Sequence, residues 1–598
     1  MVKLQKYKNH ILIALATLTF VLGIIGFSLS KESTGLEILT HTLGLYAMEW
    51  VGHEKSLILD FASLFGALTA LLAIIKIFFS KIYHTWRNFI IPKTNYNLVI
   101  GLSEQNVSLL KAKNQNLATI IIEKDKNHPQ ISSFREKGFL VIAGNTKEAV
   151  NDLDLTHMKR CFISTGNDRK NIALGKLIMK QIDDQEKHNV HVCIENRDLN
   201  ILFKQEVISP DKNKEVTMST YSLYENIVKN LFSKHSILGE HPHIINNKEE
   251  FSIVIVGDSD LAIELVYHIA FLSTLPNQNK LKLYLVGANA EAFHNRVKKT
   301  FPKIEKIPHL TLLPKELNSE SLDFYIYENE MWKSKNLTNI FIATKDEEKN
   351  LDIAINLQDT TFIKEIGHNR FKSRVLFALY HNRGLGEEID NDKDAFANFH
   401  TFGNIQKNST KEILIDEKLD KISKLILSNY NEKKDILTTE LDHSWIETLI
   451  HQQESNKTQA LHLDIKLLAF GFTRISSTKS VDELLEINNK KFYGKLEESD
   501  KIKKQLKSYK KEYFPSSFDT TLLDKVARSE HDRWSAFQYL NGWDYNPIRE
   551  NDAKEHNCLK PLEEFEEDIK HTYQYDLASV YFMPIYLARA GFEMVEKS

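Results

Sequence analysis

Imidazole, guanidinium, ammonium and indole groups are concentrated in one short stretch near the C-terminus. They belong to His531, Arg533, Trp534, Trp543, Tyr545, Arg549, Lys554 and His556. Aromatic rings stack on heterocyclic bases, while Arg and Lys hold phosphates. The stretch therefore predicts a site for an anionic, planar ligand of the nucleotide type. The alternative interpretation is that the tryptophans are core residues and the cations form a solvated rim.

A second polar stretch precedes this one in the chain. Asn456 lies in Glu454–Lys457, and His462 and Lys466 follow it. On a helix, His462 and Lys466 share one face because they are four residues apart. We add Asn456, His462 and Lys466 to the predicted ligand-binding residues.

The residue types argue against catalysis and against a metal centre. Ser529-Glu530-His531 are neighbours on one predicted helix and cannot form a catalytic triad. The two histidines of the C-terminal stretch lack acidic or cysteine partners at metal-ligand spacing. The three cysteines have no CxxC spacing, and the net charge of −3 gives no footprint for nucleic acid. We therefore expect a binding protein, with no catalytic residue, no metal and no nucleic-acid partner.

The C-terminal stretch resembles the RyR domain, a family named from ryanodine receptors and also found in bacterial proteins. The elements E-H-x-R-W, G-W-x-Y, Lys, His and L-x-P follow in the family's order between about 520 and 592. Asn546 replaces the glycine that is usual after the tyrosine. The resemblance implies a mainly helical domain. By analogy it also implies a nucleotide-signalled effector, in antiviral defence.

Upstream of this module, short apolar runs alternate with helical stretches, which predicts βαβ units and parallel sheets. The pattern occurs twice. The segment 342–351 matches 163–172 position by position, and four of the ten residues are identical. We interpret this match as an internal duplication.

Both copies resemble the RCK (TrkA-N) domains that gate potassium channels and transporters. The resemblance implies two Rossmann-like domains and, in the first, NAD or another nucleotide as cofactor. The corresponding residues of the first copy are Gly101, Ser103, Glu123 and Asn145. The family's G-x-G-x-x-G turn is incomplete in this chain, and the second copy lacks the acid that would hold a ribose. A structural scaffold is therefore the alternative for both copies.

Two apolar runs, 11–29 and 57–79, are each long enough to cross a bilayer. Lys and Arg residues flank the pair on its outer sides, whereas the connection between the runs is acidic. The positive-inside rule then places both termini in the cytoplasm. We expect a multi-pass protein of the inner membrane, in contact with lipid.

The connection between the two runs could dip into the membrane. A potassium filter needs T-x-G-Y-G, whose carbonyls replace the ion's water. Here only Thr42 and Gly44 match, so we name them as the candidate pore residues. The alternative is an interfacial amphipathic helix.

Together these features predict an α/β protein with membrane helices. Two hypotheses for its function follow from them. The first is a ligand-gated channel or membrane-perturbing effector, assembled as a homotetramer. The second is a non-conducting, membrane-anchored sensor or scaffold. The expected domains are a transmembrane domain at 1–94, RCK-like domains at 95–245 and 246–390, a helical linker with the first part of the sensor at 391–519, and the RyR domain at 520–598.

Overall fold

The structure is a computed structural model of the chain. It describes residues 2–29, 34–47, 56–90, 93–111, 117–182, 188–207, 216–239, 241–325, 330–334, 336–358, 373–381, 384–392, 396, 398–410, 413, 420–430, 450–493 and 522–597.

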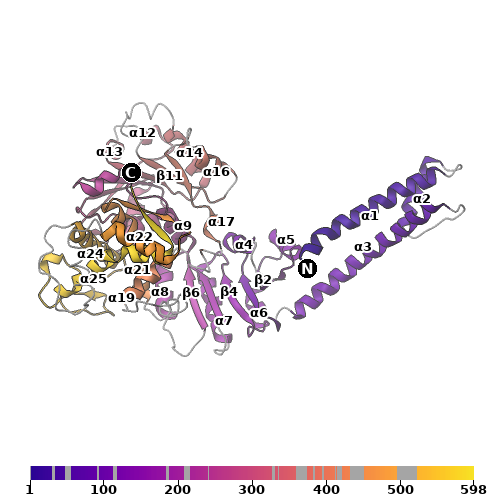
Figure 1. Ribbon diagram of the computed structural model, residues 1–598, viewed down its shortest axis with the longest axis horizontal. Helices are drawn as coiled ribbons and strands as arrows, with labels where there is room; N and C mark the ends of the chain where they lie inside the picture. The colour runs from indigo at the N-terminus through magenta and orange to yellow at the C-terminus, as the bar shows by residue number, and fades with distance from the viewer. Residues whose placement is uncertain are drawn as a thin grey trace.

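The N-terminal segment is a helical hairpin that projects away from the rest of the molecule (Figure 1). Its two long helices are α1 (Val2–Ser28) and α3 (Leu57–Ile90). Between them in sequence, α2 (Gly35–Gly44) and η1 (Leu45–Ala47) lie at the tip of the hairpin. The 3-10 helix η1 approaches α3 closely, since a Cβ atom at Gly66 of α3 would lie 2.5 Å from the Leu45 carbonyl oxygen.

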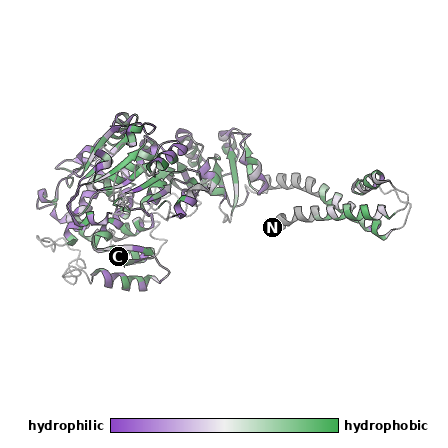
Figure 2. Ribbon diagram, turned by 90° about the horizontal axis from the view of Figure 1, so that it is seen from above, coloured by the Kyte–Doolittle hydropathy of each residue, from purple (hydrophilic) through white to green (hydrophobic). Residues whose placement is uncertain are grey.

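Helix α3 contains a segment, Leu57–Ile74, that is long and apolar enough to cross a membrane, with a mean hydropathy of 2.2. In α1 the described side chains provide a shorter apolar segment, Ala14–Ser28. Most of the exposed large apolar side chains lie in this hairpin, which is hydrophobic towards its tip (Figure 2). One candidate span is thus present among the described side chains, and a second span at 11–29 remains a prediction.

The candidate pore residues have helical rather than extended backbone. Thr42 and Gly44 lie in the last turn of α2, and the Thr42 hydroxyl donates to the Ile38 carbonyl. A carbonyl filter requires several backbone oxygens of one extended segment to face the ion. The helical carbonyls of α2 are directed along the helix instead, so Thr42 and Gly44 do not form a carbonyl filter in this structure, and their role in a pore remains a prediction.

The first α/β unit has a six-stranded parallel sheet with the order β3-β2-β1-β4-β5-β6. This is the strand order of the Rossmann fold. The strands are β1 (Tyr96–Ile100), β2 (Ala118–Glu123), β3 (Leu140–Ala143), β4 (Met158–Ile163), β5 (His188–Cys193) and β6 (Val216–Tyr221). The helices are α4 (Glu104–Lys111), α5 (Gln130–Glu136), α6 (Thr146–Asn151), α7 (Asp168–Gln181), α8 (Arg197–Val207) and α9 (Leu223–Phe232).

The second unit has the order β12-β11-β10-β7-β8-β9, which is the same strand order listed from the opposite edge of the sheet. Its last strand lies beyond the predicted domain end at 390, because a short helix intervenes before the sheet is completed. The strands are β7 (Phe251–Val256), β8 (Leu281–Gly287), β9 (Leu310–Glu316), β10 (Leu337–Ile342), β11 (Arg374–Ala378) and β12 (Phe399–Phe402). The helices are η3 (Pro242–Asn246), α10 (Asp260–Leu272), α11 (Ala290–Thr300), η4 (Ile304–Lys306), α12 (Leu322–Tyr325), α13 (Glu330–Lys333), α14 (Glu347–Gln358), α16 (Leu385–Asn391) and α17 (Ile405–Asn408).

The duplicated sequence motif forms the same hydrogen bonds in both units. Asn171 accepts from the backbone N–H of Thr165 (2.9 Å) and donates to the Cys193 carbonyl (2.9 Å). Asn350 accepts from the N–H of Thr344 (2.9 Å) and donates to a carbonyl at the end of β11 (3.0 Å). Each asparagine therefore fastens the turn after the fourth strand to the end of the fifth.

The C-terminal module is mainly helical. Two of its strands, β13 and β16, pair in an antiparallel ribbon. The elements are α19 (Lys421–Tyr430), α21 (Ile450–Ala469), β13 (Phe472–Ser476), α22 (Val481–Tyr493), α24 (Leu522–Leu540), β14 (Asp544–Tyr545), β15 (Glu555–His556), η7 (Leu562–Glu564), η8 (Lys570–Thr572), α25 (Tyr573–Tyr581), α26 (Met583–Ala590) and β16 (Phe592–Glu596).

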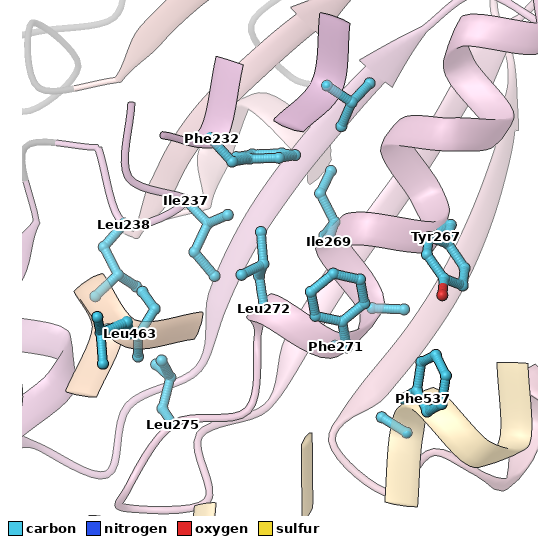
Figure 3. Packing of buried hydrophobic residues seen from close by; sticks show 14 of the residues in the cluster. Phe232, Ile237, Leu238, Tyr267, Ile269, Phe271, Leu272, Leu275, Leu463 and Phe537 are labelled. Carbon is cyan, nitrogen blue, oxygen red and sulfur yellow. The ribbon is translucent and has the colours of Figure 1, made fainter. Parts of the chain in front are cut away.

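This module and the second α/β unit share one hydrophobic core. Helix α10 is buried along its length between its own sheet and the helices α21 and α24. Figure 3 shows Phe271 and Leu275 of the α10 region near Leu463 of α21 and Phe537 of α24. The C-terminal module is therefore packed against the second sheet rather than tethered to it.

Candidate functional site

The glycine turn after β1 allows two turns of the first sheet to approach each other. Gly101 has φ +85°, and a Cβ atom there would lie 2.2 Å from the Ser164 carbonyl oxygen. The Ser103 hydroxyl donates to the Ser164 hydroxyl at 2.8 Å. The requirement for glycine at 101 thus follows from the contact with the turn after β4, without a bound phosphate.

The other two predicted cofactor residues, Glu123 and Asn145, accept hydrogen bonds from backbone N–H groups of the protein. The Glu123 carboxylate accepts from the N–H groups of Leu102 (2.6 Å) and Asp125 (2.8 Å). Asn145 caps α6 by accepting from the Lys147 N–H. Both side chains thus already have hydrogen-bond partners within the protein, and nucleotide binding at this sheet remains a prediction.

Two predicted ligand residues, Arg533 and Lys466, belong to a buried ionic cluster that joins α21 to α24. Arg533 donates two hydrogen bonds to the Glu530 carboxylate, at 2.9 and 2.8 Å. The Lys466 ammonium lies 2.6 Å from the same carboxylate, and Arg533 also donates to the Thr458 hydroxyl. Although burial disfavours the carboxylate, these two cations lower the pKa of Glu530 to about 2. The ion pairs therefore hold the two helices together and leave Arg533 and Lys466 inaccessible to solvent.

His462 connects the same helix to the second α/β unit. Its Nε2 atom lies 2.8 Å from the Thr274 carbonyl oxygen, just after α10. Burial, together with the Lys466 and Arg533 cations, lowers the pKa of His462 to about 3. Asn456 is also buried on α21. These positions favour a structural role for the predicted residues of α21.

Three of the remaining predicted residues form a second cluster together with His451. We call it the indole–imidazole cluster: Trp534, Trp543, His556 and His451. Ring centroids of Trp534 and His556 are 4.9 Å apart, and those of Trp543 and His556 are 6.2 Å apart. His451 stacks on Trp543 at 4.9 Å with an interplanar angle of 26°. Trp543 is only 7% exposed, so it supports the imidazoles, which are half-buried together with Trp534.

Sequence analysis did not single out His451. It lies at the start of α21, well before the C-terminal motifs. A signal was present in the spacing, because His451, Thr458 and His462 are seven and four residues apart and share one helical face. On this face Thr458 bonds to Arg533 and His462 to Thr274. His451 lies on the same face at the N-terminal end of α21, where it is half-buried.

Cations lie at the rim of the indole–imidazole cluster. Arg549 is exposed and donates to the Asn551 side chain, whereas Lys554 is half-buried and donates to the Asn541 carbonyl (3.1 Å). Tyr545 is exposed beside the rim, with the Lys560 ammonium 5.3 Å from the centre of its ring. The structure thus brings aromatic, imidazole and cationic groups of the predicted set together.

The pKa values of the three imidazoles in this region are shifted in different directions. Burial and the neighbouring cations lower the pKa of both His451 and His556 to about 4, so both are neutral at neutral pH. His531 lies beneath them, with Nδ1 3.5 Å from the Asp576 carboxylate and Nε2 3.0 Å from the Lys560 carbonyl. Although burial opposes the charged form, Asp576 raises the pKa of His531.

The strand beside this cluster is held to the second α/β unit by ion pairs. The Asp544 carboxylate lies 2.6 Å from the Lys303 ammonium and 2.5 Å from that of Lys306. Against the effect of burial, hydrogen bonds from both lysines lower the pKa of Asp544 to about 2. Asp544 directly follows Trp543, so these ion pairs connect the indole–imidazole cluster to both ends of η4.

Comparison with known proteins identifies one region. Residues 515–583 match the family model of the RyR domain. The match covers α24, β14, β15 and α25, which carry Trp534, Trp543 and His556 but not His451. No curated protein matches the chain. The C-terminal module therefore contains a RyR domain, packed on a chain with two Rossmann-like parallel sheets.

Proposed function

We propose that the protein is a ligand-gated membrane channel or membrane-perturbing effector, and that its RyR domain binds a nucleotide-like signal. The observation that carries the proposal is the indole–imidazole cluster with Arg549 and Lys554 at its rim. Half-buried rings can stack on a base, and a rim of cations can hold phosphates. The ionic cluster of Glu530 keeps α24 in place beneath this surface.

A connected series of contacts supports transmission from the site to the membrane hairpin. Asp544 joins the RyR domain to η4 of the second unit. Within that unit, Glu264 of α10 accepts two hydrogen bonds from Arg197 of the first unit, both at 3.0 Å. Helix α3 precedes the first unit in the sequence and contacts its strand β3. A ligand shifts such a system only if it binds one state better than the other.

We further propose that α1 and α3 both cross the inner membrane, with cytoplasmic termini and lipid around them. Support comes from one continuous exposed apolar face of α3, formed by Leu57, Phe61, Leu64, Leu68 and Leu71. By the resemblance to RCK domains, the α/β units would assemble the chain into a homotetramer. Light scattering of the detergent-purified chain tests this, and a monomer would refute it.

The decisive experiment is ion flux in liposomes that contain the full chain, with and without added nucleotides. Nucleotide-dependent flux is the expected result, and Arg549→Ala should shift it to higher nucleotide concentration. Arg549 suits this test because its side chain is exposed, so its removal should leave the packing of the domain unchanged. Flux that ignores every nucleotide, or that Arg549→Ala leaves unchanged, would remove the ligand site from the rim.

A non-conducting sensor or scaffold is the second candidate, favoured by the helical backbone at Thr42 and Gly44. It predicts nucleotide binding by the same RyR surface without any flux. Calorimetric binding and liposome flux, measured on one preparation, separate the two candidates.

A further inference from the structure

The ligand surface of the RyR domain is completed by a residue from outside that domain. His451 belongs to α21, whereas the family match begins at residue 515. Its ring stacks on Trp543 and lies 5.1 Å from the ring of Phe537. An isolated RyR domain would therefore lack one of the two neutral imidazoles that border the indole–imidazole cluster.

Hydrogen bonding fixes which nitrogen atom of His451 carries the proton. Nε2 lies 2.8 Å from the Oε1 atom of Gln538, a side chain that is 4% exposed. Because Oε1 only accepts, Nε2 must donate, and Nδ1 is left as a hydrogen-bond acceptor. Within the described part of the chain, no residue hydrogen-bonds Nδ1.

His556 has the opposite polarity. Its Nδ1 atom accepts from the backbone N–H of Cys558 at 3.1 Å. A neutral imidazole that accepts at Nδ1 carries its proton at Nε2 and can donate there. Both rings stay neutral at neutral pH, so this pair of one acceptor and one donor persists under those conditions.

We infer that His451 and His556 together read one edge of a base, with His451 accepting from the base and His556 donating to it. The inference rests on the proposed nucleotide site and specifies its ligand. On the edge that carries N7, adenine presents an amino donor beside a ring acceptor, whereas guanine presents two acceptors. The pair therefore fits an adenine nucleotide and leaves His451 without a donor when guanine is bound.

The test is calorimetric binding to the full chain in nanodiscs with four probes: ATP, GTP, purine riboside triphosphate, which lacks the amino group, and inorganic tripolyphosphate. One lost hydrogen bond should weaken binding about two- to tenfold. ATP is therefore expected to bind more tightly than GTP and purine riboside triphosphate by that factor, and more tightly still than tripolyphosphate.

Matched variants of each imidazole isolate the two nitrogen atoms. His451→Gln keeps a donor for Gln538 but has no Nδ1 acceptor, and His556→Asn keeps an acceptor for the Cys558 N–H but has no Nε2 donor. His451→Gln should bring ATP and purine riboside triphosphate to similar affinity, whereas His556→Asn should weaken the binding of both about equally, because both carry N7. His451→Asn and His556→Gln retain the ligand-facing group and should preserve part of the preference for ATP.

The outcomes separate this inference from the proposed function. If ATP binds but the preference is absent or survives His451→Gln in folded protein, or if His556→Asn leaves the affinity for ATP unchanged, the base-reading role is refuted while the nucleotide site stands. If no nucleotide binds the wild-type chain, or tripolyphosphate binds as tightly as ATP, the nucleotide site itself is refuted. Thermal unfolding midpoints establish that each variant is folded.

Discussion

The two α/β units share a strand order but use the same helix in different ways. In the first unit, the helix after the glycine turn is α4, which has exposed residues at both ends, Glu104 and Lys111. In the second unit the corresponding helix is α10, where every residue from Leu261 to Leu272 is buried. A duplicated fold thus fixes the path of the chain, while the sequence of one helix decides whether the unit carries a further module.

Charged groups inside α10 are paired where they meet the neighbouring unit. Glu264 is 4% exposed and accepts from Arg197, whose guanidinium also lies 3.4 Å from the centre of the Tyr267 ring. Burying a charge is costly unless it is paired and hydrogen-bonded. The Arg197–Glu264 pair therefore satisfies a charged side chain within a buried and largely apolar helix, and it links the two units at a defined point.

The largest expected effect is at the shared core. Phe271→Ala removes a fully buried ring between the second sheet and the C-terminal module. It should lower the free energy of unfolding by about 3–5 kcal/mol. Because one core serves both parts, both should lose stability together. Urea unfolding followed by tryptophan fluorescence and by circular dichroism should give coincident transitions.

Leu109→Ala in α4 is the matched control in the first unit. Leu109 is buried in a separate cluster of the first sheet. The substitution should destabilise that unit and leave unfolding of the C-terminal module unchanged. If instead Phe271→Ala shifted the second unit alone, the module would be an independent domain and the contrast between α4 and α10 would fail.

The duplicated asparagines give the next effect, which should be similar in both units. Asn171→Ala and Asn350→Ala each remove a buried side chain that accepts from a threonine turn and donates to a strand end. Leaving these partners unsatisfied should cost about 2–4 kcal/mol in either unit. Chemical denaturation of the two variants would measure this. A small effect at one position and a large effect at the other would show that only one copy depends on the turn.

Much of the fold was readable from the sequence, for local physical reasons. The strands are apolar runs that end at a glycine or a polar turn, and Asn171 and Asn350 marked the repeat because the same hydrogen bonds recur. The RyR stretch was found from its motifs, and the match at 515–583 confirms that part. The β12 strand was missed because it follows a short helix beyond the expected boundary.

The division of the predicted ligand residues could not be read from the sequence. Arg533 and Trp534 are neighbours in the chain, yet one is buried in an ion pair with Glu530 and the other is half-buried beside His556. Adjacent helical residues point in different directions, and only the packing of α21 shows which direction is covered. His451 was missed for the same reason, since its role depends on a contact across the module.

A smaller effect is expected where the RyR domain meets η4. Asp544→Asn removes the charge that pairs with Lys303 and Lys306, but the pair is partly exposed. The free energy of unfolding should fall by less than about 1 kcal/mol. Nucleotide affinity should stay nearly unchanged, while ligand-dependent flux in liposomes should decrease. Unchanged flux would show that the signal does not pass through this contact.

The smallest effect concerns a histidine that bridges the two units directly. His381, which follows β11, lies 2.9 Å from the Glu104 carboxylate of α4 through Nε2 and 2.9 Å from the Glu347 carboxylate through Nδ1. Hydrogen bonding to Glu104, and then to Glu347, raises the pKa of His381 against the effect of burial. Glu347 also accepts from the N–H groups of Tyr380 and His381, as Asp168 does from two N–H groups after β5.

His381→Gln should therefore make the contact between units insensitive to pH. A raised pKa in the folded state stabilises the protein fully below the pKa of the unfolded chain, about 6.5, and this contribution is lost as pH rises through the folded-state pKa. The side chain is 48% exposed, so solvent screening keeps the contribution below about 1 kcal/mol.

Thermal unfolding of wild type and variant at pH 6 and pH 9 provides the measurement. The wild-type advantage should be present at pH 6 and absent at pH 9, because only the protonated imidazole binds both carboxylates as a cation. An advantage that is equal at the two pH values would mean that His381 contributes through its neutral hydrogen bonds alone, and that the two units meet without a charged bridge.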